Sequence, residues 1–592
     1  MRGAVENGTR VVDHIARILK DLSATQVFGV TGGSIMGLFD ALALEDFEIY
    51  MFRHEQGAAH AADAYGRIAR RPGIALATSG PGATNLVTGI ANAYFDSAPM
   101  VAITGQVPTS VFGRDAFQET DIVGVTAPIT KFAYQVKKPE EAGPAIRTAY
   151  RLAVEGRPGP TLVDLPRDVQ LTKYEPRDEP EYLPIDFAKY QPPSPDPEAV
   201  RRAARLLLAA SRPVILVGTG VYWSGATAEV IELAERLQAP IVTTLPGKNA
   251  VPADHPLVMG PAGMHGRAEA DAALANADVI LAVGTRFSDR TVGRFEPELR
   301  EKKIIHIDID PSEHGKNVPP AVSIIADARE ALQAILREMP AVPQRDKRFI
   351  EWLLWIRRRY EDAMEKLAAR MRKFAPWKVL KTLRQAVPRN TITVTGVGSH
   401  QMWSEIHWDV YVPGTWVTSA GLGTMGFCIP AALGAKIAAR DRPVLCIDGD
   451  GSFQMTMNNL ALVRDYDLPI IVTVFDNRAL MLVKQWQIFL YDRRIVATEY
   501  SQWPDFTKIA EAYGIEAIRP ASLEEIDTAV RRAIRNNEPL IVVVDIDNNE
   551  DIVLPWVKPG EWLTDAILPP GMEDVSLVFR EEKLAAAPAA GR

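Results

Sequence analysis

Short apolar runs alternate with longer amphipathic segments along most of the chain. The runs have the length of buried strands, as at 27–30, 213–217 and 443–447, and several are flanked by Gly or Pro. The segments between them are long enough for helices, and regular strand–helix alternation is typical of a parallel sheet. The pattern therefore predicts an α/β protein. Further runs of this kind lie at 48–52, 74–78, 100–103, 160–164, 240–244, 278–283, 303–308, 391–395, 469–474 and 539–544.

Two stretches without such alternation interrupt the pattern. The first, near 173–198, is crowded with Pro, Asp, Glu and Tyr, as in a linker. The second, near 338–375, carries two prolines and then a charged, Trp-bearing helical stretch. These breaks predict three consecutive parallel α/β domains, at 8–175, 196–340 and 376–565, followed by a tail at 566–592. We expect the last residues of this tail, 583–592, to be disordered.

The composition of the chain argues mainly against certain classes of function. The 592 residues are 47% hydrophobic and 24% charged, with a net charge of −8 spread along the chain, so neither nucleic-acid binding nor a polybasic membrane patch is indicated. No apolar run approaches the roughly 20 residues of a membrane span, and the N-terminus lacks the apolar core of a signal peptide. With only Cys428 and Cys446, we expect neither a disulfide framework nor a thiolate metal site. The sequence predicts a large cytoplasmic enzyme.

A turn rich in Asp and Gly is the strongest local signal. Asp448-Gly-Asp450-Gly451 follows one predicted strand, and Asp476-Asn477 follows the next. Because the carboxyl ends of neighbouring parallel strands meet at one edge of the sheet, Asp450 and Asn477 could supply oxygen ligands to one Mg²⁺ ion. Glycines there would let phosphates approach the backbone. A tight turn with a capping Asp explains this turn equally well.

A second glycine loop formally matches a dinucleotide fingerprint. Gly421-Leu-Gly423-Thr-Met-Gly426 has the G-x-G-x-x-G spacing between a strand-like run and a predicted helix. The acidic residue expected at the end of the next strand is missing, because Asp441 precedes that strand. We interpret the segment as a glycine loop that holds a different cofactor.

Glu55 lies where a predicted strand leads into an Ala-rich helix. An isolated Glu at this place usually caps the helix. Here, however, several other open turns occur in the same domain, at Gly32-Gly33, 79–83 and 115–119. Glycine-lined loops that converge on one carboxylate indicate a catalytic cleft.

Taken together, these motifs resemble those of the thiamine-diphosphate-dependent decarboxylase superfamily, and within it the catalytic subunits of acetolactate (acetohydroxyacid) synthases. The resemblance runs from about residue 10 to 565. It implies an N-terminal pyrimidine-binding domain, a central FAD-binding domain and a C-terminal diphosphate-binding domain. The motifs that carry it are at 53–57, 79–85, 105–110, 115–119, 157–160, 263–266, 286–290, 306–311, 421–426, 449–456, 485–487 and 491–494.

The resemblance implies a role for each matching residue of the outer domains. Glu55 would hydrogen-bond the aminopyrimidine ring and promote removal of the thiazolium C2 proton. Met425 would force the two rings of the cofactor together, although a lone Met is more often a core residue, and the Gly423 carbonyl would accept from the exocyclic amine. Mg²⁺ would be bound by Asp450, Asn477 and the carbonyl of Ala479. The other cofactor positions are Gly32, Gly33, Gly398, Ser399, His400, Gly449, Gly451 and Ser452.

The same resemblance assigns flavin and substrate positions. Arg290 would hold the carboxylate of the acceptor 2-keto acid, since an Arg fork suits a carboxylate. Phe117, Met264 and Trp486 would line the acceptor pocket, and Gln118 would reach the reaction intermediate; Trp486 lies in a predicted lid helix. The FAD positions are Gly218, Gly220, Thr244, Leu245, Met264, His265, Gly284, Arg286, Arg290, Asp308 and Asp327.

The implied reaction is decarboxylation of pyruvate and ligation of the remaining two-carbon unit to pyruvate or 2-ketobutyrate, the first common step of branched-chain amino acid biosynthesis. Alternatives are a sulfoacetaldehyde acetyltransferase-like or glyoxylate carboligase-like enzyme, although Glu55 argues against the latter, a pyruvate-oxidase-type flavoenzyme, or a non-catalytic scaffold. We expect a homodimer or homotetramer with its active site between subunits, and a small regulatory subunit is possible. Several residues depart from the family pattern, and these departures cluster around cofactor and acceptor binding: Thr31, Gly396, Ser399, Asn459, Asp476, Met481 and Leu482.

Overall fold

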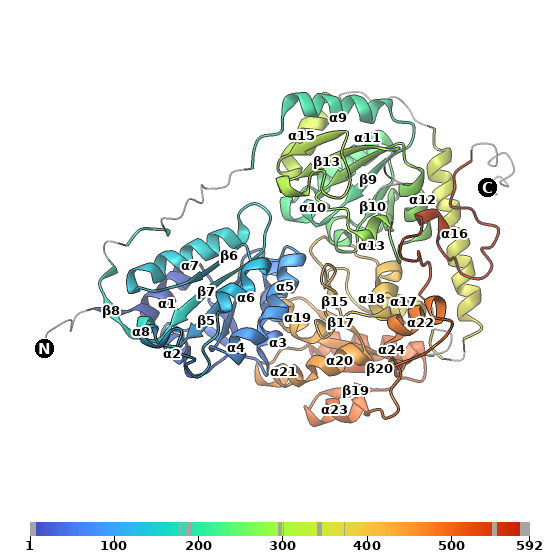
Figure 1. The fold of residues 1–592 in the computed structure, drawn as a ribbon. Helices are drawn as coiled ribbons and strands as arrows, with labels where there is room; N and C mark the ends of the chain where they lie inside the picture. The colour runs from blue at the N-terminus through green and yellow to red at the C-terminus, as the bar shows by residue number, and fades with distance from the viewer. Residues whose placement is uncertain are drawn as a thin grey trace, which may run out of the picture.

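A computed structural model describes residues 8–176, 179–183, 192–293, 299, 301–339, 346–371, 373–546 and 553–580. It contains three six-stranded parallel sheets, each covered by helices (Figure 1). The α/β class and the three-unit organisation of the sheets are therefore as the sequence predicts. The expected disordered tail, 583–592, lies outside the described residues. No helix in the described ranges has both the length and the apolar composition required to cross a bilayer.

The N-terminal domain has the strand order β3-β2-β4-β5-β7-β6. Its strands β4 and β5 are buried along their whole length, as expected for a sheet covered on both faces. The strands are β2 (Gln26–Val30), β3 (Glu48–Met51), β4 (Gly73–Ala77), β5 (Met100–Gln106), β6 (Phe132–Gln135) and β7 (Pro160–Pro166); the helices are α1 (Val11–Asp21), α2 (Met36–Leu44), α3 (Glu55–Ala69), α4 (Pro81–Asn85), α5 (Val87–Phe95), α6 (Ile122–Thr126), α7 (Pro139–Val154) and α8 (Arg167–Leu171).

The central domain has the order β11-β10-β9-β12-β13-β14. Its middle strands, β9 and β12, pair in register from Pro213 and Val279 onward, so their glycine-bearing carboxyl ends lie side by side. The strands are β9 (Pro213–Val217), β10 (Ile241–Thr243), β11 (Val258–Pro261), β12 (Val279–Val283), β13 (Lys303–Asp308) and β14 (Val322–Ile325); the helices are α9 (Pro197–Ala209), α10 (Thr219–Ser224), α11 (Thr227–Leu237), the 3-10 helix η4 (Pro246–Ala250), α12 (Ala268–Asn276), α13 (Asp289–Val292) and α15 (Ala328–Glu338).

The C-terminal domain has the order β16-β15-β17-β18-β20-β19. Because β17 and β18 are neighbours, the two loops predicted to bind metal leave the same edge of the sheet. The strands are β15 (Ile392–Thr395), β16 (Trp416–Thr418), β17 (Val444–Gly449), β18 (Ile471–Asp476), β19 (Glu516–Ile518) and β20 (Leu540–Asp545); the helices are α17 (Pro376–Ala386), α18 (Ser399–His407), α19 (Cys428–Ala438), α20 (Asp450–Thr456), α21 (Ala461–Asp465), α22 (Met481–Leu490), α23 (Phe506–Ala512) and α24 (Leu523–Asn536).

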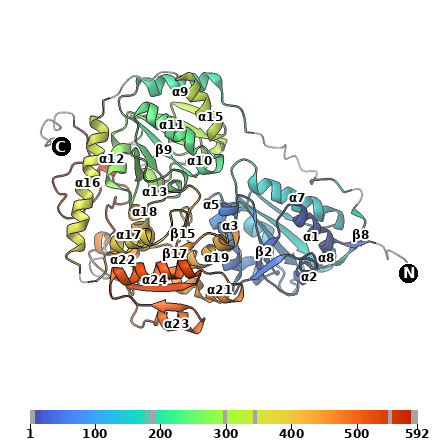
Figure 2. The same ribbon diagram turned by 180° about the vertical axis from the view of Figure 1, so that it is seen from behind.

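Small residues join the N-terminal and C-terminal domains. Helices α3 and α19 lie side by side at the centre of the molecule in Figures 1 and 2. A Cβ atom at Gly434 would lie 2.1 Å from the carbonyl oxygen of Ala61, so the two helices approach through their backbones. Ala58, Ala61 and Ala62 are completely buried. The Ala-rich segment after Glu55 is therefore a helix that is buried on more than one face.

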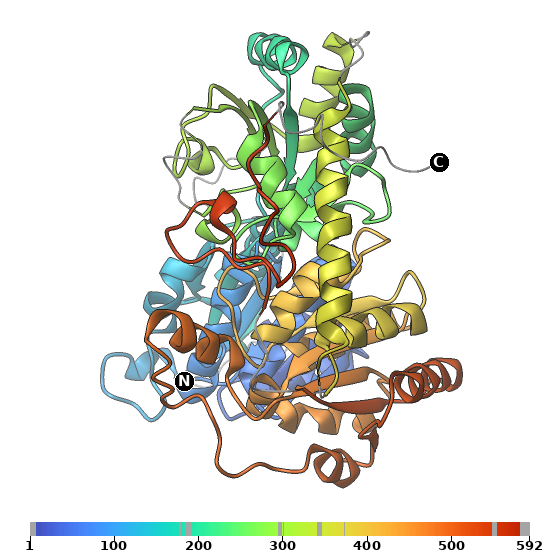
Figure 3. The same cartoon turned by 90° about the vertical axis from the view of Figure 1, so that its right-hand side faces the viewer.

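The long helix α16 (Arg348–Ala368) connects the central and C-terminal domains. It is the charged, Trp-bearing helix predicted for this stretch, and its buried face includes Trp352 and Ile356. Figure 3 shows α16 beside the segment that follows β20, which is drawn in red. Arg359 forms an ion pair with Asp574 of that segment, at 2.6 Å. The part of the tail described up to residue 580 thus packs against α16.

The structure also contains strands that the sequence pattern does not reveal. β1 (Thr9–Arg10) and β8 (Lys173–Tyr174) form a small antiparallel pair. The other unpredicted strands are edge strands of three or four residues, namely β6, β11, β14, β16 and β19. Short edge strands carry too few apolar residues for a periodicity signal.

Candidate active site

Asp450 holds together the two loops predicted to bind a metal. It is the first residue of α20, and its carboxylate accepts hydrogen bonds from the backbone N–H groups of Asn477 (2.8 Å), Arg478 (2.6 Å) and Gly451 (2.6 Å). Burial raises the pKa of Asp450 to about 7, and these amide hydrogen bonds oppose the increase. The structure therefore brings Asp450, Asn477 and Ala479 to one edge of the sheet, as the two-loop pattern predicts.

The neighbouring Asp476 is paired with an arginine that sequence reasoning missed. Asp476 and Asp545 end the adjacent strands β18 and β20, and Arg519 follows β19 beside them. Arg519 donates to Asp476 Oδ2 at 3.1 Å and also to Asp545. Burial raises the pKa of Asp476, and Arg519 opposes this. Arg519 thus offsets part of the negative charge that Asp476 and Asp545 place at this edge of the sheet.

Two buried polar atoms without a hydrogen bond lie at the start of α18. The Ser399 hydroxyl and His400 Nε2 make no hydrogen bond to any described residue, although His400 Nε2 lies 3.5 Å from Asp448 Oδ1. Burial lowers the pKa of His400 to about 3, so the ring is neutral. Gly398 has φ +148°, and a Cβ atom at Gly449 would lie 2.4 Å from His400 Nδ1. The two glycines therefore leave room for a helix N-terminus that carries unsatisfied donors.

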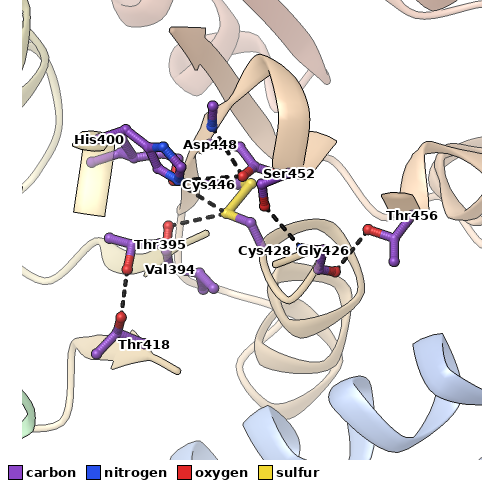
Figure 4. Close-up of a disulfide and its surroundings, with 12 residues drawn as sticks. Val394, Thr395, His400, Thr418, Gly426, Cys428, Cys446, Asp448, Ser452 and Thr456 are labelled. Carbon is purple, nitrogen blue, oxygen red and sulfur yellow. Dashed lines mark hydrogen bonds and ion pairs between the residues drawn. A yellow bond between two sulfur atoms is a disulfide. The ribbon is translucent and has the colours of Figure 1, made fainter. Parts of the chain in front are cut away.

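The glycine loop at 421–426 is fixed against α20. The backbone N–H of Gly426 donates to the Ser452 hydroxyl at 2.9 Å, and the Thr456 hydroxyl donates to the Gly426 carbonyl at 2.7 Å (Figure 4). Gly423 and Gly426 have φ values of +71° and +83°, which favour glycine. A Cβ atom at Gly451 would lie 3.5 Å from Met425 Cε, so Met425 is beside the loop that is predicted to bind a metal.

The expectation about cysteines is wrong for this loop. Cys428 and Cys446 form a disulfide across 18 residues of sequence (Figure 4). It joins the start of α19 to strand β17, and both residues are completely buried. Two cysteines 18 residues apart give no sequence signal for pairing, because their proximity depends on the packing of α19 against the sheet. The disulfide links the 421–426 loop to the strand that leads into Asp450.

Glu55 lies in a separate group of loops in the N-terminal domain. It begins α3, is largely buried, and accepts a hydrogen bond from Asn85 Nδ2 at 2.9 Å. Two glycines of the α4 turn are in close contact with this group, since a Cβ atom at Gly82 would lie 3.2 Å from Glu55 Oε1 and one at Gly80 would lie 2.9 Å from Gln118 Cβ. The α4 turn therefore lies against both Glu55 and Gln118.

Three other predicted positions belong to this domain. A Cβ atom at Gly32 would overlap the Thr78 side chain, at 2.6 Å, whereas one at Gly33 would meet nothing within 4 Å. Phe117 is 89% exposed beside Gln118.

A cavity of about 950 Å³ lies between the three domains. Every position assigned to flavin by resemblance lines it, together with Gly423, Leu482 and Trp486. It is not lined by Glu55, Gln118 or Phe117, nor by the residues predicted to bind a metal. The structure thus separates the predicted site into three groups: the Glu55 cleft, the Asp450 loops and this cavity.

Close backbone contacts shape one wall of the cavity. A Cβ atom at Gly218 would lie 2.0 Å from the Gly284 carbonyl oxygen, and Gly220 is packed against Gly284 in the same way. These glycines follow β9 and β12 at the carboxyl edge of the central sheet, where dinucleotides bind in such folds. His265 Nε2 is buried with no hydrogen-bond partner in the described structure. The wall therefore presents exposed backbone and an unsatisfied polar atom to a ligand.

Charged residues surround this wall. Burial raises the pKa of Asp308 to about 7 and lowers that of Arg286. Arg290 lies at the opening, with its guanidinium 5.7 Å from the centre of the Trp486 ring and 2.6 Å from the Met264 sulfur. The three residues assigned to the acceptor are thus in one place, whereas Phe117 is elsewhere.

Comparisons with known proteins agree with this geometry. Models of the thiamine pyrophosphate enzymes match residues 9–125 (N-terminal TPP binding domain), 200–335 (central domain) and 396–544 (C-terminal TPP binding domain). The chain is 43% identical to the probable acetolactate synthase large subunit of Methanocaldococcus jannaschii, over 93% of this chain and 94% of that protein. It is 40% identical to the acetolactate synthase large subunit of Corynebacterium glutamicum, over 93% and 89%.

A third relative is the isozyme 3 large subunit of acetolactate synthase from Escherichia coli, 37% identical over 92% of this chain and 96% of that protein. The similarity therefore covers all three sheets and both sets of loops. It spans nearly the full length of this chain and of its relatives. The chain belongs to the acetolactate synthase large-subunit family of thiamine pyrophosphate enzymes.

Proposed function

We propose that the chain catalyses the decarboxylating ligation of pyruvate to a second 2-keto acid, pyruvate or 2-ketobutyrate, with thiamine diphosphate, Mg²⁺ and FAD bound. The observation that carries this proposal is the cavity in which Arg290, Met264 and Trp486 meet. Arg290 forms no ion pair with any residue that the structure describes, and an arginine beside an aromatic wall suits the carboxylate and the short apolar chain of a 2-keto acid.

The residues of the C-terminal domain fit a metal-bound diphosphate. Asp450, the Asn477 side chain and the Ala479 carbonyl would hold Mg²⁺, which prefers a few oxygen ligands and completes its shell with phosphate and water. Ser399 and His400 carry buried polar atoms with no hydrogen bond among the described residues. With the N-terminus of α18 they would bind the phosphate oxygens.

The central cavity fits FAD by size and by chemistry. About 950 Å³ is ample for a cofactor larger than most drug-sized ligands. The Gly218, Gly220 and Gly284 contacts expose backbone to the ligand, and Asp308 and Asp327 lie at the same edge, where an acidic residue can bind ribose hydroxyl groups.

The chain's own residues would divide the catalytic work. Thiamine diphosphate, when bound, supplies the nucleophilic carbon and accepts the electron pair released by decarboxylation. Glu55, held by Asn85 in a buried cleft, would hold and transfer a proton at the aminopyrimidine ring. Gln118, next to Gly80, would hydrogen-bond the reacting group, and Arg290 would orient the acceptor carboxylate.

This division requires more than one chain. We infer a homodimer or homotetramer in which the Glu55 cleft of one subunit faces the Asp450 loops of another, because exposed Phe117 marks an open surface beside Glu55. The relatives are named large subunits, which supports a small regulatory subunit as a further partner.

The test uses purified protein with all three cofactors. Pyruvate is given alone and then with 2-ketobutyrate, glyoxylate or sulfoacetaldehyde, and the products are identified. Acetolactate and acetohydroxybutyrate are expected. Bleaching of the flavin by pyruvate at the catalytic rate would instead identify an oxidase.

The Glu55→Gln variant is expected to lower turnover at least 100-fold, because general acid–base catalysis contributes about 10²–10⁴-fold. Glu361→Gln, which changes an exposed glutamate on α16, is the matched control and should have full activity. Unchanged acetolactate output in Glu55→Gln would contradict the assignment.

A further inference from the structure

The central cavity contains a buried acid to which no role has been assigned. Glu405 lies on α18, is 6% exposed, and lines the cavity. No hydrogen bond or ion pair joins its carboxyl group to another described residue. A buried carboxyl group without a partner costs free energy unless a ligand satisfies it.

The cations nearest to Glu405 form no ion pair with its carboxyl group in the described structure. Lys248, on η4, donates to the backbone carbonyl oxygens of Ser404 (2.8 Å), Glu405 (2.5 Å) and Trp408 (2.9 Å), and its ammonium lies 4.7 Å from the centre of the Trp416 ring. Lys248 therefore caps the C-terminal end of α18. Arg290, on α13, faces the Trp486 ring at the opening of the cavity.

The charge states of the titratable groups around Glu405, and its own pKa, favour the uncharged form of its carboxyl group. Burial lowers the pKa of His265, His400 and His407 to about 3, so all three rings are neutral. Arg267 and Asp409 form an ion pair with each other at 2.9 Å. Burial raises the pKa of Glu405 to about 8, and Lys248 and Arg290 oppose this increase. Near neutral pH the carboxyl group is therefore mainly protonated.

Glu405 shares one helix face with two other lining residues, Gln401 and Met402. These positions lie three and four residues before it, which places them on the same side of α18. The Gln401 amide already donates to the Thr418 hydroxyl (2.7 Å) and the Ser419 carbonyl (2.9 Å). On this face Glu405 is thus the hydrogen-bonding group that remains for a ligand.

We propose that the protonated Glu405 carboxyl group donates a hydrogen bond to a carbonyl or ring-nitrogen acceptor of the FAD isoalloxazine ring and so positions the ring in the cavity. The inference rests on the flavin assignment made under the proposed function. A protonated carboxyl group offers a donor beside an acceptor, which matches a ring edge that carries both carbonyl oxygens and an N–H group. The competing ligand, a 2-keto acid, is an anion whose charge is matched by Arg290 instead.

The test measures FAD binding directly. Flavin-free protein is titrated with FAD by fluorescence at pH 6.5 and pH 9.5, for the wild type, Glu405→Gln and Glu405→Ala. The wild type should bind about tenfold more weakly at pH 9.5, because the carboxyl group loses its proton as the pH rises through about 8. Glu405→Gln keeps the size and the donor but cannot ionise, so its affinity should be near that of the wild type at pH 6.5 and should not change with pH.

Glu405→Ala should bind FAD about tenfold more weakly than the wild type at pH 6.5, again without pH dependence. Glu511→Gln, at an exposed position of α23, is the matched control and should follow the wild type. Equal affinity and equal pH profiles for all variants would overturn the proposal, as would a change in the acceptor KM with FAD affinity unaltered. A wild-type protein that binds no FAD would overturn the flavin assignment itself. If Glu405→Ala does not fold, the pH profile of Glu405→Gln decides alone.

Discussion

Arg519, a residue outside the predicted motifs, changes the charge balance at Asp476. Asp476 precedes the proposed metal ligand Asn477 and is almost completely buried. Its partner follows β19, more than 40 residues further along the chain, and also contacts Asp545. A buried carboxylate is tolerated when an arginine neutralises it, and removing one partner costs more than the pair contributes.

Replacement of Arg519 should therefore destabilise the C-terminal domain. Arg519→Ala leaves Asp476 buried and unpaired, so we expect a loss of about 1–3 kcal/mol, seen as a lower midpoint of thermal denaturation. Asp476→Asn should recover most of this loss in the double variant, because the unpaired charge is then removed. Arg532→Ala, which breaks an exposed ion pair with Glu516, is the control and should have little effect. Additive effects of the two substitutions would contradict the coupling.

Sequence motifs predict site residues only where residues of suitable chemistry also lie at a recognisable spacing along the chain. Asp450 and Asn477 follow consecutive strands of the sequence that are also neighbours in the sheet, so the pattern was sufficient to bring them together. Arg519 and Glu405 belong to no motif. A glutamate on a helix is usually solvated, and only the packing of α18 against the central domain makes Glu405 a buried lining residue.

The disulfide acts on a whole element, because it attaches helix α19 to strand β17. Helix α19 also packs against α3 of the N-terminal domain, so the covalent link lies between the glycine loop and the domain contact. Closing a loop of this length removes conformational freedom mainly from the unfolded chain.

Alkylation and mass spectrometry test this link. The denatured chain should take up no iodoacetamide before reduction and two equivalents after it, since the two cysteines are paired. Reduction of the native protein should lower its free energy of unfolding by about 3 kcal/mol, the value expected for a closed loop of about this size. Cys428→Ser should denature at the temperature of the reduced protein, with or without reductant. Two alkylated cysteines in the unreduced chain would contradict the pairing.

Strands that are more deeply buried were easier to predict from the sequence. Central strands such as β9 and β12 are five-residue apolar runs, and their bounds match the prediction within one residue. Edge strands such as β16 and β19 have three residues and gave no signal. The order of strands within each sheet also lay beyond the pattern, because it depends on which crossover connections pack together.

At the scale of the whole molecule, one chain does not bring the predicted catalytic groups together. Glu55 and Gln118 lie in the N-terminal domain, Asp450 lies on the C-terminal loops, and the central cavity is lined by none of the three. The sequence predicts three domains and their separate motifs, but the relative placement of these domains follows from contacts such as that between α3 and α19. An active site shared between subunits reconciles this separation with the proposed reaction.

Mixing two inactive variants tests the shared site. Glu55→Gln lacks the proton-transfer group, and Asp450→Ala lacks a proposed metal ligand; each alone should be inactive. In a mixed dimer, one site combines the intact Glu55 of one subunit with the intact Asp450 of its partner, and the other site lacks both. If subunits exchange at random, half of the dimers are mixed, so about a quarter of wild-type activity should return. A site contained within one chain would give no recovery, and a fully active monomer in sedimentation would contradict the shared site independently.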